Sequence, residues 1–329
     1  MSRISALYHP ARFQSRMSHD GWFEGWYFKL VDPEGRHPVA VIPGISRDER
    51  GGTSHAFVQT IRAGGTARYH RFGFDEFAWT DDRFSIAVGP NRFDEAGLHL
   101  ELEDDLAGDV TFGTWAPWPV RALSPGIMGW YRFVPRMECY HGVLSLDHTL
   151  DGALSEGNNP LDFSGGRGYT EKDWGTGFPS SWVWAQSNRF TDEYGRPRPG
   201  VSLTASVAKI PWLGSSFVGH IAGVLLDTGE LVRFTTYTGS RLEAVETGAG
   251  SARVVVSNRR HRLELTLSGA RTGTLKAPSL GAMTGRADEA LDATVEIHLT
   301  DTGGATRFRG IGACAGVEIM NERDELHPD

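Results

Sequence analysis

The most constraining feature of this 329-residue chain is its dense punctuation by turn-forming residues. It contains 41 glycines and 16 prolines, and the segments between them are short, alternate in polarity and favour β-branched and aromatic residues. Typical segments lie at 22–31, 55–61, 138–146 and 182–190, and turn signals such as Asp-Pro-Glu-Gly at 32–35 separate them. Short alternating segments with regularly spaced turns predict a sandwich or barrel of antiparallel strands.

The number of candidate strands sets the domain organisation that we expect. The chain carries about fifteen of them, and two barrels of about eight strands each have the size that encloses one small ligand. We therefore predict an all-β fold of two consecutive lipocalin-like antiparallel β-barrels, one at 1–178 and one at 179–329. The segment 191–200 is interpreted as a hairpin turn because alternating strands flank it, and one short helix is expected at 279–291.

Composition and charge exclude several classes of protein. The formal net charge is -8 and the arginines are scattered, which argues against nucleic-acid partners and against attachment to anionic membranes. No stretch approaches the roughly 18 uninterrupted apolar residues of a membrane helix. The N-terminus lacks the apolar region of a secretory signal, so we expect a cytoplasmic protein. Cys139 and Cys314 form no CxxC pair and are expected to be reduced, buried thiols.

Two aromatic segments, 22–28 and 182–188, carry polar side chains among their rings. Strand alternation gives each segment one shared face, made of Trp22, Glu24, Trp26 and Phe28 in the first and of Trp182, Trp184, Gln186 and Asn188 in the second. Aromatic walls with a few placed polar groups are typical of a small-molecule pocket. A core strand whose polar groups bond to the backbone fits each segment equally well.

A histidine and an acidic stretch are the candidate acid–base groups. His141 is expected to share a face with Cys139, where it is either a satisfied core residue or a group that titrates near neutrality. In the segment 168–175, an extended chain points Tyr169, Glu171 and Asp173 to the same side. Carboxylates held close together keep a proton, and a neutral carboxylic acid can donate it. The alternative is a charged surface turn in which a lysine neutralises a neighbour.

Several motifs are absent from the sequence. It has no glycine-rich phosphate loop before a helix, no HExxH motif and no nucleophile elbow of the GxSxG type, and its 12 histidines lack the spacing of metal ligands. We therefore expect a site that uses no cofactor and no metal.

Five words in the sequence occur together in one family. They are WFEGWY at 22–27, PGIMG at 125–129, MECYHGV at 137–143, GYTEKDWGTGFP at 168–179 and WVWAQSN at 182–188. In these words, and in their order from about residue 20 to 320, the chain resembles the tocopherol cyclase family. More distantly it is similar to carotenoid hydratases and two-barrel lipocalin-like cyclases.

The resemblance implies a reaction and a set of roles. Tocopherol cyclases close a prenylated hydroquinone to a chromanol by protonating an alkene and capturing the cation with the phenol oxygen. In the wider group a Tyr-x-Asp pair is thought to supply the proton, and Tyr169-Thr170-Glu171 matches that pair with Glu in place of Asp. We thus expect Glu171 to donate the proton, Tyr169 to orient it and His141 to accept the phenol proton. The expected substrate-binding residues are Glu24, Trp26, Tyr27, Asp173, Trp174, Trp184, Gln186 and Asn188.

Three hypotheses follow from these expectations. The first is an intramolecular lyase of the tocopherol cyclase type acting on a prenylated phenol or related isoprenoid. The second is a non-catalytic carrier of an apolar ligand, and the third is a hydratase or another cyclase on the same scaffold. In all three the partner is an apolar small molecule, with no nucleic acid and no stable membrane insertion, although transient membrane contact is compatible with such a ligand.

Overall fold

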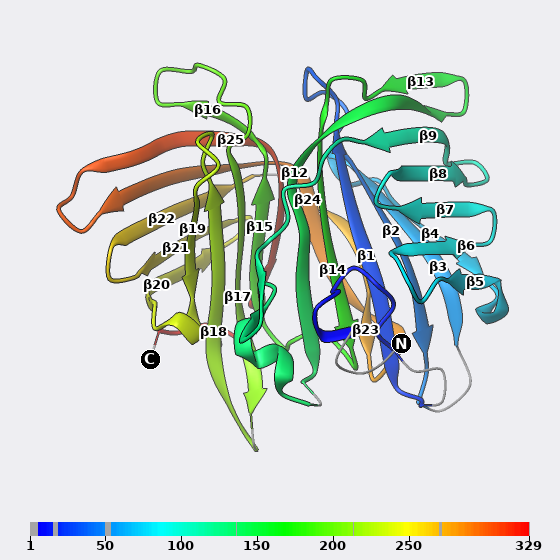
Figure 1. Cartoon of the computed structure of the whole chain (residues 1–329), viewed down its shortest axis with the longest axis horizontal. Helices are drawn as coiled ribbons and strands as arrows, with labels where there is room; N and C mark the ends of the chain where they lie inside the picture. Colours follow the sequence, from blue (N-terminus) through cyan, green and yellow to red (C-terminus); the bar gives the residue numbers. More distant parts are fainter. Residues whose placement is uncertain are drawn as a thin grey trace. The chain divides into compact units, whose positions relative to one another are not determined.

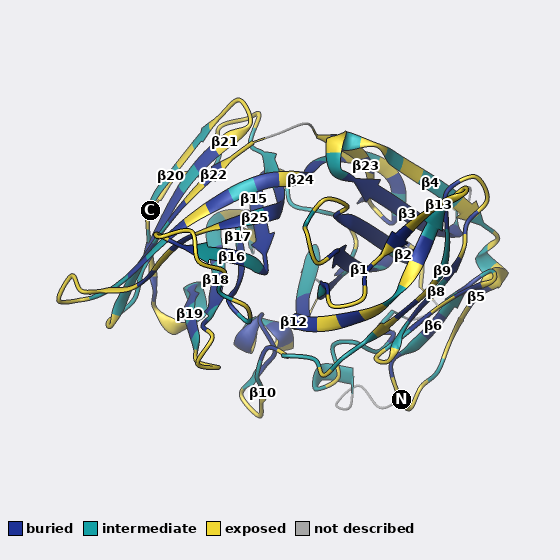
Figure 2. Ribbon diagram, turned by 90° about the horizontal axis from the view of Figure 1, so that it is seen from above, coloured by how far each residue is buried: buried dark blue, intermediate teal, exposed yellow. Residues whose placement is uncertain are grey.

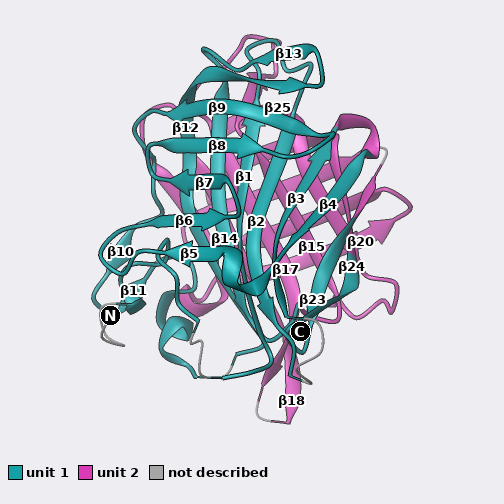
Figure 3. Ribbon diagram, turned by 90° about the vertical axis from the view of Figure 1, so that its right-hand side faces the viewer, with its two compact units in different colours: residues 1–62, 66–178, 275–286 teal, residues 63–65, 179–274, 287–329 magenta. Residues whose placement is uncertain are grey.

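The computed structural model describes residues 6–15, 19–49, 54–135, 137–212, 214–269 and 272–328. The chain divides into two compact units, coloured separately in Figure 3. The first comprises residues 1–62, 66–178 and 275–286, and the second comprises 63–65, 179–274 and 287–329. A single boundary at residue 178 therefore does not describe the two units fully. Residues 275–286 return to the first unit after most of the second unit has been formed.

The described part of the first unit is built on one large antiparallel sheet (Figure 1). Its strands, in hydrogen-bonded order, are β4 (Ala67–Phe72), β3 (His55–Arg62), β2 (Val39–Arg47), β1 (Trp22–Val31), β14 (Arg167–Gly175), β12 (Cys139–Glu156), β9 (Leu106–Phe112), β8 (Gly97–Glu101), β7 (Asn91–Asp94), β6 (Ser85–Val88) and β5 (Phe77–Trp79), while β13 (Asn159–Asp162) pairs with β12. The predicted turn at 32–35 joins β1 to β2, where the amide of Gly35 bonds to Asp32 O at 2.9 Å. Gly35 has a φ of 71°, a conformation that glycine adopts without steric cost.

The long strand β12 bends the sheet over on itself. Its first part pairs with β14 and its second part with β9, and the register shifts twice, between Val143 and Ser145 and between Ser145 and His148. Register shifts of this kind increase the local twist of a strand. Figure 2 shows buried and exposed residues alternating along the second part of β12.

Aromatic side chains fill the space that this bend encloses. Trp26 and Phe28 of β1 are fully buried, and both stack on Phe84, with ring centroids 6.0 and 6.3 Å away. Phe28 also stacks on Phe93 of β7 at 5.6 Å. The inner face of β1 therefore belongs to a packed core.

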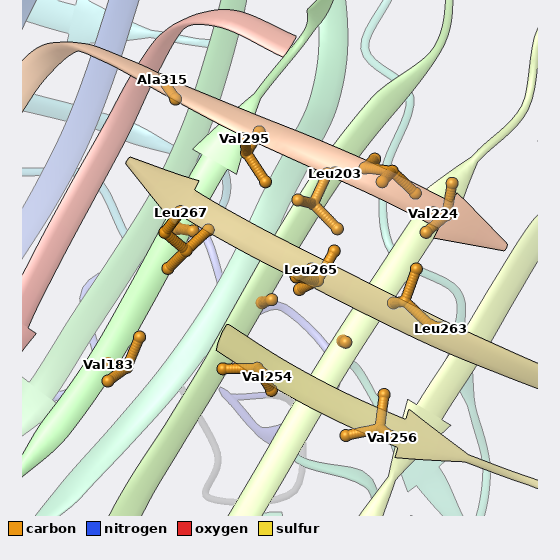
Figure 4. Close-up of a cluster of buried hydrophobic side chains, with 14 of the residues drawn as sticks. Val183, Leu203, Val224, Val254, Val256, Leu263, Leu265, Leu267, Val295 and Ala315 are labelled. Atoms are coloured by element: carbon orange, nitrogen blue, oxygen red, sulfur yellow. The ribbon is translucent and has the colours of Figure 1, made fainter. Parts of the chain in front are cut away.

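The second unit has its own sheet and core. Its strands follow the order β19 (Leu231–Thr235), β18 (Ser215–Leu225), β17 (Ser202–Trp212), β15 (Trp182–Ser187), β25 (Thr306–Met320), β24 (Ala282–Asp301), β22 (His261–Ser268), β21 (Ser251–Ser257) and β20 (Arg241–Gly248), with β16 (Arg189–Asp192) on β25. Residues 282–286 of β24 belong to the first unit, as does most of β23 (Gly273–Ser279), which pairs with β24. Aliphatic side chains such as Val183, Leu203 and Leu265 pack together in its interior (Figure 4). The segment 191–200 lies between the antiparallel partners β15 and β17, as the hairpin interpretation expected.

Two expectations need correction. The segment 279–291 is not a helix, because β24 begins at Ala282 and pairs through Glu289 and Ala290 with β25. Its helix-forming residues are overridden by the ladder and by the burial of alternate side chains. The all-β, lipocalin-like fold is confirmed, but the sheets are not closed barrels. In the described residues each sheet is an open path, ending in β4 and β5 in one unit and in β19 and β20 in the other.

Among the described residues, no helix is long and apolar enough to cross a bilayer.

Candidate active site

The registers of β1, β14 and β12 align the candidate residues in two rows across the outer face of the first sheet, the face opposite its packed core. One row consists of Gly25, Asp173 and His141, and the next consists of Tyr27, Glu171 and Val143. Directly opposed residues of antiparallel strands project to the same side of the sheet. Thus His141, 32 residues before Asp173 in the chain, becomes its direct neighbour.

Asp173, His141 and Glu171 from these rows form one continuous chain of contacts with Tyr169. The hydroxyl of Tyr169 donates a hydrogen bond of 2.5 Å to Oε2 of Glu171. Nε2 of His141 lies 3.6 Å from the same oxygen, and Nδ1 of His141 lies 2.9 Å from Oδ1 of Asp173. We call Tyr169, Glu171, His141 and Asp173 the acid cluster. The three predicted catalytic residues and one predicted binding residue are therefore brought together.

The acid cluster has a buried end and an accessible end. Tyr169 is fully buried, and the side chain of Glu171 is 7% exposed, compared with 16% for His141 and 25% for Asp173. Gly25 is the least buried residue of β1, and a Cβ built on it meets no described atom closer than Pro43 O at 3.8 Å. The accessible end therefore lies beside a position that has no side chain.

The charges of the cluster hold a proton on His141. Burial alone lowers the pKa of His141, but the charges of Asp173 and Glu171 and the hydrogen bond to Asp173 outweigh it and raise this pKa from 6.5 to about 9. At neutral pH the ring is an imidazolium between two carboxylates. The cluster thus stores a proton that can be transferred.

The same groups have the donor set of a metal site. Ligand atoms of His141, Glu171 and Asp173 lie within 4.8 Å of one another. A metal ion needs a neutral imidazole, so it would have to displace the proton that the raised pKa of His141 holds in place. The expectation of a metal-free site remains a prediction.

Two residues near the acid cluster were not among the predicted site residues. Lys29 lies opposite Tyr169 on the same face of β1 and is only 1% exposed. Strand alternation from Tyr27 could have identified it. The thiol of Cys139 lies 3.8 Å from Oδ1 of Asp173, and burial together with the charge of Asp173 raises its pKa, so it stays protonated. Cys139 therefore acts as a weak donor to Asp173 and not as a nucleophile.

Tyr27 shares the face of the acid cluster, and its ring meets that of Tyr169 edge to face at 6.5 Å. Glu24, Trp26 and Trp174 lie on the opposite, inward face of the sheet, because they alternate with the cluster residues along β1 and β14. They therefore face the side of the sheet opposite Glu171, and their expected role in binding remains a prediction.

On the inward face, Glu24 forms a buried ion pair. Nζ of Lys172 lies 2.5 Å from Oε1 of Glu24, and both side chains have no solvent exposure. Glu24 also accepts hydrogen bonds from the amides of Gln14 and Ser15, at 2.7 Å each, and Trp26 donates to Ala11 O at 2.8 Å. These contacts hold the N-terminal segment against the sheet. The interpretation of Glu24 as a structurally bonded core carboxylate fits this geometry.

The remaining predicted residues, Trp184, Gln186 and Asn188, belong to the second unit. All three are buried, and Val183 and Ala185, which alternate with them, pack into the core of that unit. Trp184 and Gln186 therefore project to the other side of β15, where Trp184 lies beside Glu318 in the ladder. Their expected role in binding remains a prediction.

Comparison with known proteins identifies the family. A match to the family described as tocopherol cyclase-like covers residues 110–319, more than half of the chain. The chain is 28% identical over 168 residues to the chloroplastic tocopherol cyclase of Zea mays, covering 50% of this chain and 34% of that protein. It is 25% identical over 230 residues to a probable chloroplastic tocopherol cyclase of Oryza sativa subsp. japonica, covering 61% and 47%. The chain thus spans less than half of the length of either relative.

Solved structures share the fold at low sequence identity. The crystal structure of CghA with Sch210972 is similar with a TM-score of 0.55 and 11% identity, covering 91% of this chain and 89% of that one. Kievitone hydratase from Nectria haematococca is similar with a TM-score of 0.51 and 11% identity, covering 92% and 91%. At such identities the likeness extends to the fold alone.

Proposed function

Since this chain belongs to the tocopherol cyclase-like family, we propose that it is an acid catalyst that closes a ring on a prenylated phenol or a related isoprenoid. The observation that carries the proposal is the acid cluster, in which Glu171 lies between a phenol donor and an imidazolium. A carrier of apolar ligands needs only apolar walls, and ionised groups under its binding face would cost free energy. The cluster therefore favours catalysis over simple carriage.

The reaction balances without any co-reactant. The proton held by His141 passes from Nε2 to Oε2 of Glu171, 3.6 Å away, and Glu171 gives it to an alkene carbon of the substrate. The phenol oxygen of the same substrate then bonds to the resulting tertiary cation, and the phenol proton returns to the cluster. Substrate and product have the same atoms, so the reaction is an isomerisation.

The raised pKa of His141 revises the order of events that the sequence suggested. An imidazole with a pKa of about 9 is already protonated at neutral pH and cannot accept the phenol proton at the start. It can accept that proton only after the alkene has taken the first one. His141 is thus both the source and the final acceptor of the proton, and Asp173 keeps its ring in place.

The aromatic rings beside Glu171 suit a cationic intermediate. Tyr27 and Tyr169 meet edge to face on the same side of the sheet. Aromatic faces attract cations, and this attraction is stronger where water is excluded. We expect a substrate whose apolar tail lies over this face with its alkene close to Glu171.

Replacement of Glu171 by Gln tests the proposal. With dimethyl-phytylbenzoquinol as substrate, the wild-type protein should form a chromanol of unchanged mass, and Glu171→Gln should lower turnover by roughly 10²–10⁴-fold. Ligand binding should be retained, because the side chain keeps its shape. Glu103→Gln, at an exposed position, is the matched control and should leave turnover unchanged.

Three results would contradict parts of the proposal. Wild-type turnover in the Glu171→Gln variant would exclude Glu171 as the acid. A product heavier by one water would indicate a hydratase. If the wild-type protein forms no chromanol from dimethyl-phytylbenzoquinol, tocopherol cyclisation is excluded. Mass spectrometry of the small molecules that co-purify with the protein would then identify the isoprenoid that it holds.

A further inference from the structure

A group of exposed apolar side chains protrudes from the first unit, away from the acid cluster in sequence. Val120, Leu123, Trp130 and Phe133 are 43%, 84%, 44% and 42% exposed, and we call them the apolar surface. Val120 and Leu123 belong to the small hairpin of β10 (Val120–Arg121) and β11 (Ser124–Pro125), whose exposed turn is visible in Figure 2. Trp130 and Phe133 belong to the short 3₁₀ helix η3 (Gly129–Phe133), which packs against β11. The four side chains therefore come from adjoining elements.

The charge of this segment differs from that of the whole chain. The net charge of the protein is -8, yet residues 110–137 contain no Asp or Glu and include three arginines. One of these, Arg121, is exposed in the hairpin itself. The global charge argues against anionic membranes, but the charge that acts on a surface is the local one, since salt screens charges beyond about 10 Å.

Contacts with the N-terminal segment and with Trp174 fix the backbone that carries the apolar surface. The guanidinium of Arg132, between the exposed Trp130 and Phe133, turns inward and lies 4.7 Å from the ring centroid of Trp174. Its Nη2 donates to Oε1 of Gln14 at 2.6 Å. The hydroxyl of Tyr8 donates to Ala122 O at 2.8 Å and so holds the hairpin. The exposed side chains are thus presented outward by a well-anchored framework.

We propose that the apolar surface docks reversibly on a lipid bilayer that contains anionic headgroups, from which the protein takes its substrate. Trp side chains prefer the membrane–water interface, Leu, Val and Phe enter the acyl region, and Arg pairs with anionic headgroups. Exposed apolar groups beside the exposed Arg121, in a segment without acidic residues, match this partner in chemistry and charge. Uptake of substrate from the bilayer rests on the proposed function, because an isoprenoid substrate partitions into membranes.

Flotation with vesicles tests the docking without any substrate. The full-length protein should float with vesicles of phosphatidylcholine and phosphatidylglycerol, and less with phosphatidylcholine alone or at high ionic strength. A Leu123→Glu/Trp130→Glu variant should bind the anionic vesicles at least tenfold more weakly than the wild-type protein. The Arg121→Glu variant should also bind them more weakly, and its loss of binding should be larger at low ionic strength than at high ionic strength.

The matched control changes exposed apolar residues elsewhere. Tyr194 and Ile311 of the second unit are 74% and 45% exposed, and Tyr194→Glu/Ile311→Glu adds the same charge. This control should float like the wild-type protein. Failure of the wild-type protein to float, equal binding by the Leu123→Glu/Trp130→Glu variant, or equal loss in the control would each overturn the proposal.

Turnover separates this proposal from the proposed function. With substrate in detergent micelles, Leu123→Glu/Trp130→Glu should keep wild-type turnover, and with substrate in anionic vesicles it should lose at least tenfold. Glu171→Gln should float normally and turn over substrate at least roughly a hundredfold more slowly in both. Vesicle turnover by the Leu123→Glu/Trp130→Glu variant at the wild-type rate would overturn substrate uptake at this surface, whereas an inactive wild-type protein that floats would contradict only the proposed function.

Discussion

The hydroxyl of Tyr169 donates its hydrogen bond to Glu171 two residues further along β14, and this bond of 2.5 Å lies where the strand is most deeply buried. Residues i and i+2 of a strand project to the same side, so the pair is set by local geometry. What turns the pair into a proton-transfer site is the third group, His141, which arrives from β12.

Removal of the Tyr169 hydroxyl should impair the acid without removing it. We expect Tyr169→Phe to lower turnover by roughly ten- to hundredfold, less than the loss of Glu171, because the carboxyl loses its orienting donor. The free energy of unfolding should fall by about 1–3 kcal/mol, since a buried acceptor is left unsatisfied. Steady-state kinetics across pH and urea denaturation measure the two effects, with Tyr194→Phe, at an exposed position, as the control. An unchanged rate and pH profile in Tyr169→Phe would exclude a positioning role.

Protein stability should depend on pH through His141. Its pKa is raised from 6.5 to about 9 in the folded state, so its stabilisation is fully present below pH 6.5 and is lost as the pH rises through about 9. Because one pKa unit corresponds to about 1.36 kcal/mol, the wild-type protein should lose about 3–4 kcal/mol in its free energy of unfolding across this range, relative to His141→Gln. In the wild-type protein we expect turnover to fall as the pH rises through about 9, where His141 loses its proton. This fall should be absent from the pH–rate profile of the His141→Gln variant. Urea denaturation and kinetics at both ends of the range provide the measurement.

His99 supplies the control for this pH dependence. It also contacts two carboxylates, those of Glu101 at 3.0 Å and Asp109 at 2.8 Å, but its side chain is 36% exposed. Because solvent screens such surface pairs, His99→Gln should change the pH dependence far less than His141→Gln. Equal effects of the two substitutions would show that burial of the acid cluster is not what retains the proton.

The ion pair of Glu24 and Lys172 should be costly to break from one side. Lys172→Met leaves the Glu24 carboxylate buried without its cation, and we expect a loss of about 3–5 kcal/mol in the free energy of unfolding. The double variant Glu24→Gln/Lys172→Met should recover part of this lost free energy, because it no longer buries an unpaired charge. Arg36→Met breaks the pair with Glu34, whose side chains are 70% and 60% exposed, and should cost less than about 1 kcal/mol. A double variant that is less stable than Lys172→Met would contradict this account.

Filling the position of Gly25 should hinder the substrate while leaving the acid intact. A Cβ is accommodated there, with Pro43 O at 3.8 Å as its nearest described neighbour, and Val suits a strand. We expect Gly25→Ala to be nearly neutral and Gly25→Val to raise KM for a bulky substrate, with the pH–rate profile of the wild-type protein retained. Kinetics with short and long prenyl chains measure this effect. A uniform loss for both chain lengths would place the substrate elsewhere.

The amino-acid sequence by itself determined the class of fold and much of the local sidedness. Turn residues between short alternating segments specified β-strands, and the period of two placed Tyr169, Glu171 and Asp173 on one side of theirs. The same pattern could not tell which side of a strand would be packed, because alternation fixes relative and not absolute facing. For that reason the sequence did not show that Trp26 and Trp174 lie on the face opposite Glu171, where both are buried.

Only the tertiary structure decided the partners. The register between β12 and β14 depends on long-range hydrogen bonding and on shifts within β12, and it alone puts His141 beside Asp173 and near Glu171. Likewise Lys172 pairs across the sheet with Glu24, not with its acidic neighbours in the chain, because adjacent residues of a strand point to opposite faces. The sequence therefore supplied the acid, and the folded sheet supplied the charge that keeps a proton beside it.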